Sequence, residues 1–358
     1  RQALEIRPDS VEVHNNWANA LAAQGKLAEA IDHYRQALQI KSDSAEAHTN
    51  WGLALVAQGK LAEAIDHYRQ ALQIRPDSVE AHTNWGRALA AQGKLAEAID
   101  HYRQALQIKP DYTDALTNWG LALARQGTRA EAAEDYERAL RIRPDSAEAL
   151  NNLGVTLAQQ GKAAEAMEHY RQALQIKPEF AEVHINWGVA LATQGKLAEA
   201  IEHYRRALQI KPDSAEGHNN LGNALADQRK LTEAIEHYQK ALRLRPDNAD
   251  AHNSWGAALA QQGKPADAIE HYRQALQIKP DSADAYNNWG AALAQQGKLA
   301  EASDHFRQAL RINPDHADAH TNWGNVLAQQ GKLTEASEHY RRALKIGAAG
   351  PSNTTSRP

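Results

Sequence analysis

Asparagine recurs at intervals of 34 residues along the sequence, each time one residue before a tryptophan or a leucine. A carboxamide offers two N–H donors and one C=O acceptor, so it can hold the N–H and the C=O of an extended peptide at once. Asparagine is also a poor residue for the middle of a helix, so helix stability does not explain its recurrence. We therefore predict a peptide-binding row of nine asparagines, and the alternatives are bonding to a neighbouring helix or copying by duplication. The nine residues are Asn16, Asn50, Asn84, Asn118, Asn152, Asn186, Asn220, Asn288 and Asn322, with Ser254 in the remaining block.

An acidic residue recurs with the same period, four residues before each of these positions. Beside the asparagines it would favour a basic peptide. It also fits the first turn of a helix, where a carboxylate acts in a capping box and near the positive end of the helix dipole. We favour the capping role without excluding the other. The secondary groove acids are Glu46, Glu80, Asp114, Glu148, Glu182 and Glu216.

The 17 histidines offer a third kind of chemistry. In most blocks a glutamate lies four residues before a histidine, as in Glu63 and His67, which places both on one helix face. Two ligands hold a metal weakly, and a catalytic zinc site needs three, so we predict no metal site and no cofactor. We expect a mild pH response between pH 5 and 7 instead. There is no cysteine and no phosphate-binding glycine loop, so we predict no catalytic residue and no enzyme activity.

These residues belong to blocks of 34 residues that fill most of the chain of 358. A period of this length indicates a stacked array of repeats rather than separate globular domains. We predict a partial repeat over residues 1–10, a flexible tail over 351–358, and ten repeats between them. The ten repeats are 11–44, 45–78, 79–112, 113–146, 147–180, 181–214, 215–248, 249–282, 283–316 and 317–350.

The block 45–78 shows how each repeat should fold. Apolar residues at helical spacing, such as Trp51 and Leu55, predict a first helix, and Gly59 predicts the turn that ends it. The same spacing returns in the second half, around Tyr68, until Pro76 stops the second helix. No segment has the pattern of a strand, so we predict an all-α fold of stacked helix pairs.

The tryptophans are predicted to pack in the core of this stack. All eight stand at one position of the repeat, and leucine takes that position in the other two blocks. Replacing one by alanine should cost ~3–5 kcal/mol of stability if its side chain is fully buried. The eight residues are Trp17, Trp51, Trp85, Trp119, Trp187, Trp255, Trp289 and Trp323.

The spacing of Gly52, Ala64, Tyr68, Ala71 and Pro76 resembles the tetratricopeptide repeat (TPR). This resemblance implies a right-handed superhelical solenoid of ten helix-turn-helix repeats, with the first helix of each pair lining a concave groove. The segments NWG, AEAIEHYR and ALQIKPD are also similar to the TPR region of O-linked N-acetylglucosamine transferases and to bacterial TPR scaffold proteins. The resemblance implies a protein-protein interaction scaffold in which an asparagine ladder holds a peptide backbone.

Composition limits the partners that we expect. The formal net charge of −4 lacks the basic excess typical of nucleic-acid binders, so we predict protein or peptide partners and no nucleic acid. No apolar run approaches the ~18 residues of a membrane span, so we predict no membrane insertion and a cytoplasmic location. The apolar residues of the stub Arg1–Ile6 and of the last block predict a homo-oligomer by end-on stacking. The alternative functions are a self-assembling structural protein and the recognition arm of a larger enzyme such as a glycosyltransferase, because the chain opens without Met, like a fragment.

Overall fold

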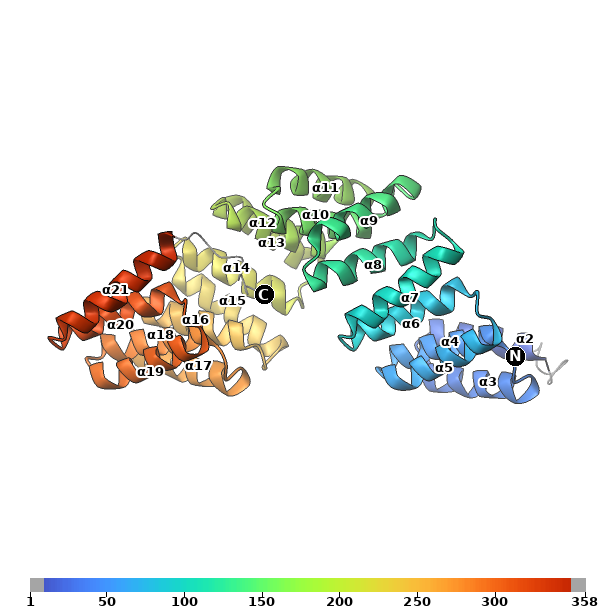
Figure 1. Cartoon of the computed structure of the whole chain (residues 1–358), viewed down its shortest axis with the longest axis horizontal. Helices are drawn as coiled ribbons and strands as arrows, with labels where there is room; N and C mark the ends of the chain where they lie inside the picture. The colour runs from blue at the N-terminus through green and yellow to red at the C-terminus, as the bar shows by residue number, and fades with distance from the viewer. Residues whose placement is uncertain (1–9, 349–358) are drawn as a thin grey trace. The chain divides into compact units, whose positions relative to one another are not determined.

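The computed structural model describes residues 10–348, and the regular structure within that range is entirely α-helical. The chain forms two compact units, with the division between Pro178 and Glu179. In each unit the helices come as pairs that lie side by side and are joined by a short turn (Figure 1). The prediction of an all-α solenoid built from 34-residue helix-turn-helix repeats is therefore confirmed.

Unit 1 holds five helix pairs within the described residues, and each pair fills one predicted repeat. The pairs are α2 (Val11–Ala23) with α3 (Leu27–Ile40), α4 (Ala45–Ala57) with α5 (Leu61–Ile74), α6 (Val79–Ala91) with α7 (Leu95–Ile108), α8 (Thr113–Gln126) with α9 (Arg129–Ile142), and α10 (Ala147–Gln159) with α11 (Ala163–Ile176).

Unit 2 repeats this arrangement within residues 179–348. Its pairs are α12 (Ala181–Thr193) with α13 (Leu197–Ile210), α14 (Ala215–Asp227) with α15 (Leu231–Leu244), α16 (Ala249–Gln261) with α17 (Pro265–Ile278), α18 (Ala283–Gln295) with α19 (Leu299–Ile312), and α20 (Ala317–Gln329) with α21 (Leu333–Ala348).

Turn residues set the end of the first helix in each pair. Gly59 has φ +78°, in the left-handed region, and the space where its Cβ would lie is empty. The conformation and not the space therefore favours glycine here. Arg229 stands at this position in one repeat and still has φ +62°. Pro265 is the first residue of α17, the helical position at which proline loses no hydrogen bond.

A glycine and a tyrosine hold the two helices of a pair together. Gly52 lies on α4 so close to the ring of Tyr68 that a Cβ there would be 2.5 Å from Cε1. The tyrosine ring is fully buried at this contact. The same contact recurs along the array, as between Gly86 and Tyr102. Glycine is required here because any side chain would overlap the ring.

The tryptophans differ from the prediction in their exposure. Each of the eight is partly exposed, whereas seven tyrosines and Phe306 of the second helices are the largest fully buried side chains. Trp51 stacks on His67 of its own repeat with the ring centroids 4.1 Å apart. Because one edge of the indole reaches the surface, its truncation should cost less than a fully buried aromatic would.

The C-terminal repeat has exposed apolar side chains on its second helix. Leu333 is 66% exposed and Leu344 is 74% exposed on α21, where no further repeat packs within the described residues. The predicted stub Arg1–Ile6 and the tail 351–358 lie outside the described residues. Among the described helices, none combines the length and the apolar character that crossing a bilayer requires.

Candidate functional site

The first helices form one continuous face within each unit, which we call the first-helix face. First helices of consecutive repeats contact one another, as α4 contacts α6 and α16 contacts α18. Within the described residues of a unit, second helices of consecutive repeats make no such contact. The first helices therefore lie on the inner side of the curve of each unit, where an elongated ligand can touch several repeats at once.

The predicted asparagines lie along this face. Asn16 is exposed, and the other eight are partly buried, including Asn186. Each precedes the tryptophan or leucine position by one residue, and one residue turns a helix by about 100°. The carboxamide is thereby directed away from the contact that its neighbour makes with the second helix.

Three asparagines donate to the preceding repeat. Nδ2 of Asn50 lies 3.4 Å from Oδ1 of Asn15, and Nδ2 of Asn288 lies 3.1 Å from Oδ1 of Asn253. Asn322 donates to Asn287 in the same way, at 3.0 Å. In these repeats one N–H of the carboxamide is already bonded to a neighbouring helix, which is the first of the two alternatives to peptide binding.

The next asparagines of unit 1 make no such bond among the described residues, and threonine stands at the position that the acceptor asparagine holds in the other repeats. The Thr49 hydroxyl donates to the carbonyl of Ala45 at 2.8 Å, within its own helix, and Thr83 and Thr117 do the same. The hydroxyl oxygen keeps lone pairs that can accept, but the carboxamide of the following repeat makes no hydrogen bond to it among the described residues. The following carboxamides are those of Asn84, Asn118 and Asn152, which we call the open asparagines.

The hydrogen bonds of the open asparagines stay within their own helices. Asn118 donates to the carbonyl of Asp114 at 2.7 Å. Oδ1 of Asn152 accepts from Asn151 at 3.5 Å, and Oδ1 of Asn84 accepts from Arg87 at 3.5 Å. Both latter contacts are long, so an incoming peptide could replace them at little cost.

Two arginines that sequence reasoning did not select lie beside the open asparagines. Arg87 and Arg125 line a pocket of about 200 Å³ together with Asn118, Tyr102 and Leu121. They are the only arginine or lysine residues within the first helices of the described chain. Arginine therefore occurs in the first helices of two neighbouring repeats only, and this pattern could have identified both residues from the sequence. The pocket offers guanidinium donors next to a carboxamide, an arrangement suited to a carboxylate or another anion.

The predicted groove acids are all exposed, and the structure pairs three of them. Asp114 forms an ion pair with Arg143 at 3.0 Å, and Glu148 lies 3.6 Å from Lys177. Glu46 accepts a hydrogen bond from Asn15 at 2.7 Å. These contacts reduce the negative charge that would attract a basic peptide.

Serine rather than the acid makes the capping hydrogen bond in six of the ten described first helices. Oγ of Ser78 accepts from the N–H of Ala81 at 3.2 Å. Glu80 is the second residue of α6 and not the third, so it does not complete a capping box. Its favourable interaction with the helix dipole remains. The acids are therefore placed in the first turn as predicted, but the capping bond belongs to their neighbours.

The histidines pair across the two helices of a repeat, which the sequence reasoning missed. Nδ1 of His82 lies 3.1 Å from Nδ1 of His101. Nε2 of His82 lies 3.2 Å from the carbonyl of Pro76, and only an N–H can bond there. His82 is then the acceptor at Nδ1 and His101 the donor. The constant spacing of 19 residues could have revealed the pairs. The seven pairs among the described residues are His14–His33, His48–His67, His82–His101, His184–His203, His218–His237, His252–His271 and His320–His339.

Burial in these pairs disfavours the charged imidazole. Burial, followed by the charge of His82, lowers the pKa of His101 to about 4. Burial, followed by the charge of His48, lowers the pKa of His67 to about 4. The response that we expected between pH 5 and 7 is therefore displaced toward lower pH for these rings. In the part of the chain that the structure describes, no three His, Asp or Glu side chains gather as metal ligands would.

Family models described as TPR repeat match residues 18–59 and the overlapping segments 188–229, 222–263 and 256–297. Models described as tetratricopeptide repeat match residues 49–113, 117–179 and 281–348. A search of curated proteins finds no match.

Solved structures of similar fold include human IFIT1. The dimer with m7Gppp-AAAA is 19% identical, covers 95% of this chain and 90% of its own, and has a TM-score of 0.59. The dimer with PPP-AAAA is 20% identical, with coverages of 95% and 91% and the same TM-score. A crystal structure of YrrB, described as a TPR protein with an unusual peptide-binding site, is 26% identical over 51% of this chain and 93% of its own, with a TM-score of 0.39.

The prediction that the partners include no nucleic acid is wrong. It relied on the near-balanced charge of the chain, yet the similar fold of human IFIT1 occurs in structures with m7Gppp-AAAA and PPP-AAAA. Net charge sums the whole surface, whereas phosphate binding depends on where single cations lie. Charge balance therefore does not exclude a nucleic-acid partner for a solenoid of this kind.

Proposed function

This chain belongs to the tetratricopeptide repeat family, and we propose that it binds an extended polypeptide segment along its first-helix face through the asparagines. The proposal is for recognition without catalysis, which is the general role of this repeat.

The observation that carries the proposal is the set of open asparagines in three successive repeats of unit 1. Asn84, Asn118 and Asn152 are partly buried on the first-helix face, and among the described residues they make no side-chain bond to a neighbouring helix. Packed helices lie about 10 Å apart, and three residues of extended chain span about the same distance. One carboxamide can therefore meet every third residue of a bound peptide, donating to its C=O and accepting from its N–H.

The arginines indicate which peptide suits this stretch. Arg87 and Arg125 add two guanidinium groups to the face beside Asn118. The nearby acid Asp114 is already paired with Arg143. We expect a preference for a segment that carries an acidic side chain next to its bound backbone, since charge-assisted bonds to guanidinium are stronger than neutral ones.

The test uses peptides selected from a random display library on the unmodified chain. The triple variant Asn84→Ala, Asn118→Ala and Asn152→Ala removes the open asparagines, and alanine favours the helix, so the fold should be kept. Loss of the three carboxamides, at a net cost of about 1 kcal/mol each, should weaken binding about 100-fold. Isothermal titration calorimetry measures the affinity, and circular dichroism verifies the helix content.

A matched control is available in the same chain. The triple variant Asn50→Ala, Asn288→Ala and Asn322→Ala removes asparagines that donate to a preceding repeat, and it should weaken binding less. Equal affinity of the unmodified chain and the open-asparagine variant would contradict the proposal. An oligonucleotide with a 5′-triphosphate is titrated in parallel. If it displaces the peptide and binds more tightly, the face is a nucleic-acid site instead.

A further inference from the structure

The second helices present arginines to the tryptophans of the following repeat. The guanidinium carbon of Arg69 lies 5.7 Å from the centre of the Trp85 ring, and the corresponding distance is 5.8 Å for Arg307 and Trp323. Arg69 also bonds Asp66 at 2.7 Å. An indole face with a carboxylate beside it is a favourable site for a guanidinium group. In these repeats the chain fills that site with its own arginine.

One repeat keeps the site but lacks the arginine. Seven of the eight tryptophans have an arginine 16 residues earlier, whereas Trp255 has Gln239. The carboxylate is still present, because Glu236 stands where Asp66 stands relative to Arg69. The indole and the carboxylate are both retained where the cation is absent.

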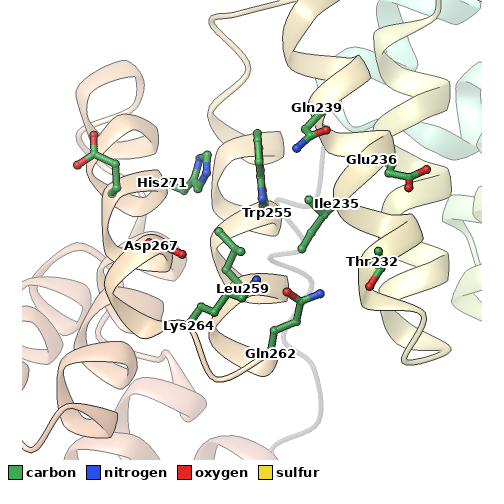
Figure 2. A pocket seen from close by; sticks show the side chains of 11 residues that line it. Thr232, Ile235, Glu236, Gln239, Trp255, Leu259, Gln262, Lys264, Asp267 and His271 are labelled. Carbon is green, nitrogen blue, oxygen red and sulfur yellow. The ribbon is translucent and has the colours of Figure 1, made fainter.

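An open pocket of about 600 Å³ occupies this place in unit 2. Figure 2 shows Trp255 in its centre, with Gln239, Ile235 and Glu236 of α15 on one side and His271 of α17 on the other. His271 stacks on the indole with the centroids 4.0 Å apart, so the face turned toward α15 is the one available to a ligand.

The charges around the pocket favour a cation. Glu236 and Asp267 line it, and among the described residues the ion pairs nearby involve Glu233 and Glu270 instead. Glu270 also lines it but is bound to Arg273 at 2.6 Å. Lys264 supplies the one positive charge on the lining. One uncompensated negative charge therefore remains beside the indole.

We propose that this pocket binds the arginine side chain of a partner polypeptide, whose guanidinium group takes the place that Arg69 or Arg307 fills in its own repeat. The guanidinium stacks on Trp255 and bonds Glu236. Ile235 and Leu259 receive the methylene groups of the arginine, since both line the pocket. The site is separate from the first-helix face and does not depend on the asparagines.

The probe is the peptide acetyl-Gly-Gly-Arg-Gly-Gly-amide, compared with the same peptide carrying citrulline, which is uncharged and nearly isosteric. The chain is labelled with ¹⁵N at tryptophan, and loss of one indole signal in the variant Trp255→Leu assigns that signal to Trp255. Leucine is a suitable replacement because two other repeats have leucine at the tryptophan position, Leu153 and Leu221. We expect the arginine peptide to shift the Trp255 signal in a saturable way and the citrulline peptide to leave it unchanged.

Two further variants change the occupant of the site. Gln239→Arg restores the internal arginine and should weaken binding of the arginine peptide about tenfold or more. Arg69→Gln opens the equivalent site and should make the Trp85 signal respond as well. Equal binding by the unmodified chain and Gln239→Arg, equal shifts with citrulline, or no shift at millimolar peptide would overturn the proposal. The variant that lacks the open asparagines should bind the arginine peptide normally. The test of arginine binding at Trp255 is therefore independent of the test of peptide binding on the first-helix face.

Discussion

Two neighbouring repeats of unit 1 have the same backbone arrangement but different contacts between their helices. Repeat 79–112 joins α6 and α7 by the pair His82–His101. Repeat 113–146 has Leu116 and Asp135 at the equivalent positions, and both side chains are buried. Asp135 bonds Arg138 of its own helix at 3.0 Å, so no polar bond crosses between the helices there.

The difference separates what the fold requires from what it tolerates. Both repeats keep a glycine against a buried aromatic ring, as at Gly86 with Tyr102 and Gly120 with Tyr136. The polar contact can be exchanged for a leucine and an aspartate. Close packing of the two helices is therefore common to both repeats, whereas the response to pH depends on the histidine pairs.

The largest effect should come from acid. Burial, followed by the charge of the paired histidine, lowers the pKa of His101 and of His271 to about 4 in the folded chain. Histidine in the unfolded chain titrates near 6.5. The unfolded state therefore binds protons first as the pH falls, and folding stability decreases between about pH 6.5 and 4 and is unaffected above that range.

Urea midpoints followed by circular dichroism at pH 7.5, 6, 5 and 4.5 test this decrease. The triple variant His48→Leu, His67→Asp and Gln70→Arg gives one more repeat the residues of repeat 113–146, and its midpoint should depend less on pH. A midpoint that stays constant from pH 7.5 to 4.5 would show that the histidine pairs do not disfavour protonation.

The next effect is that of a methyl group at the close helix contact. A Cβ at Gly86 would lie 2.5 Å from Cε1 of Tyr102, so Gly86→Ala should cost about 3 kcal/mol. At Gly120 the corresponding distance is 2.9 Å, and Gly120→Ala should cost less. Gly93→Ala has open space but φ +80°, and should cost about 1 kcal/mol. Thermal unfolding gives the order, and a milder loss at Gly86 than at Gly93 would contradict this explanation.

Removing one histidine of a pair should have a smaller effect. His82→Leu leaves Nδ1 of His101 without an acceptor, as Nδ1 of His169 already is beside Leu150. A buried polar atom without a partner costs about 1–2 kcal/mol. The triple variant His82→Leu, His101→Asp and Gln104→Arg copies repeat 113–146 and should recover much of that loss. Thermal midpoints at pH 7.5 compare the two, and equal midpoints would rule out a cost for the orphaned nitrogen.

The sequence of a single repeat was sufficient to predict the helix pairs, because the turn glycine, the proline and the apolar spacing determine helices within that repeat. Which asparagines stay open could not be predicted from their own positions. It depends on the residue 35 positions earlier, where Thr83 bonds its own helix but Asn253 accepts from Asn288. The site at Trp255 depends likewise on a side chain of the preceding repeat, Gln239. Contacts between repeats, and not the repeat itself, determine where the chain has free binding groups.

The smallest effect should come from helix capping, in which the two repeats also differ. Oγ of Ser78 accepts from the N–H of Ala81 at 3.2 Å, whereas Tyr112, the N-cap residue of α8, makes no side-chain capping bond. Ser78→Ala should therefore cost about 1 kcal/mol. Ser78→Asn should keep the bond, because Asn248 caps α16 in the same way at 3.1 Å. Equal urea midpoints for the alanine and asparagine variants would mean that α6, like α8, is held by packing alone.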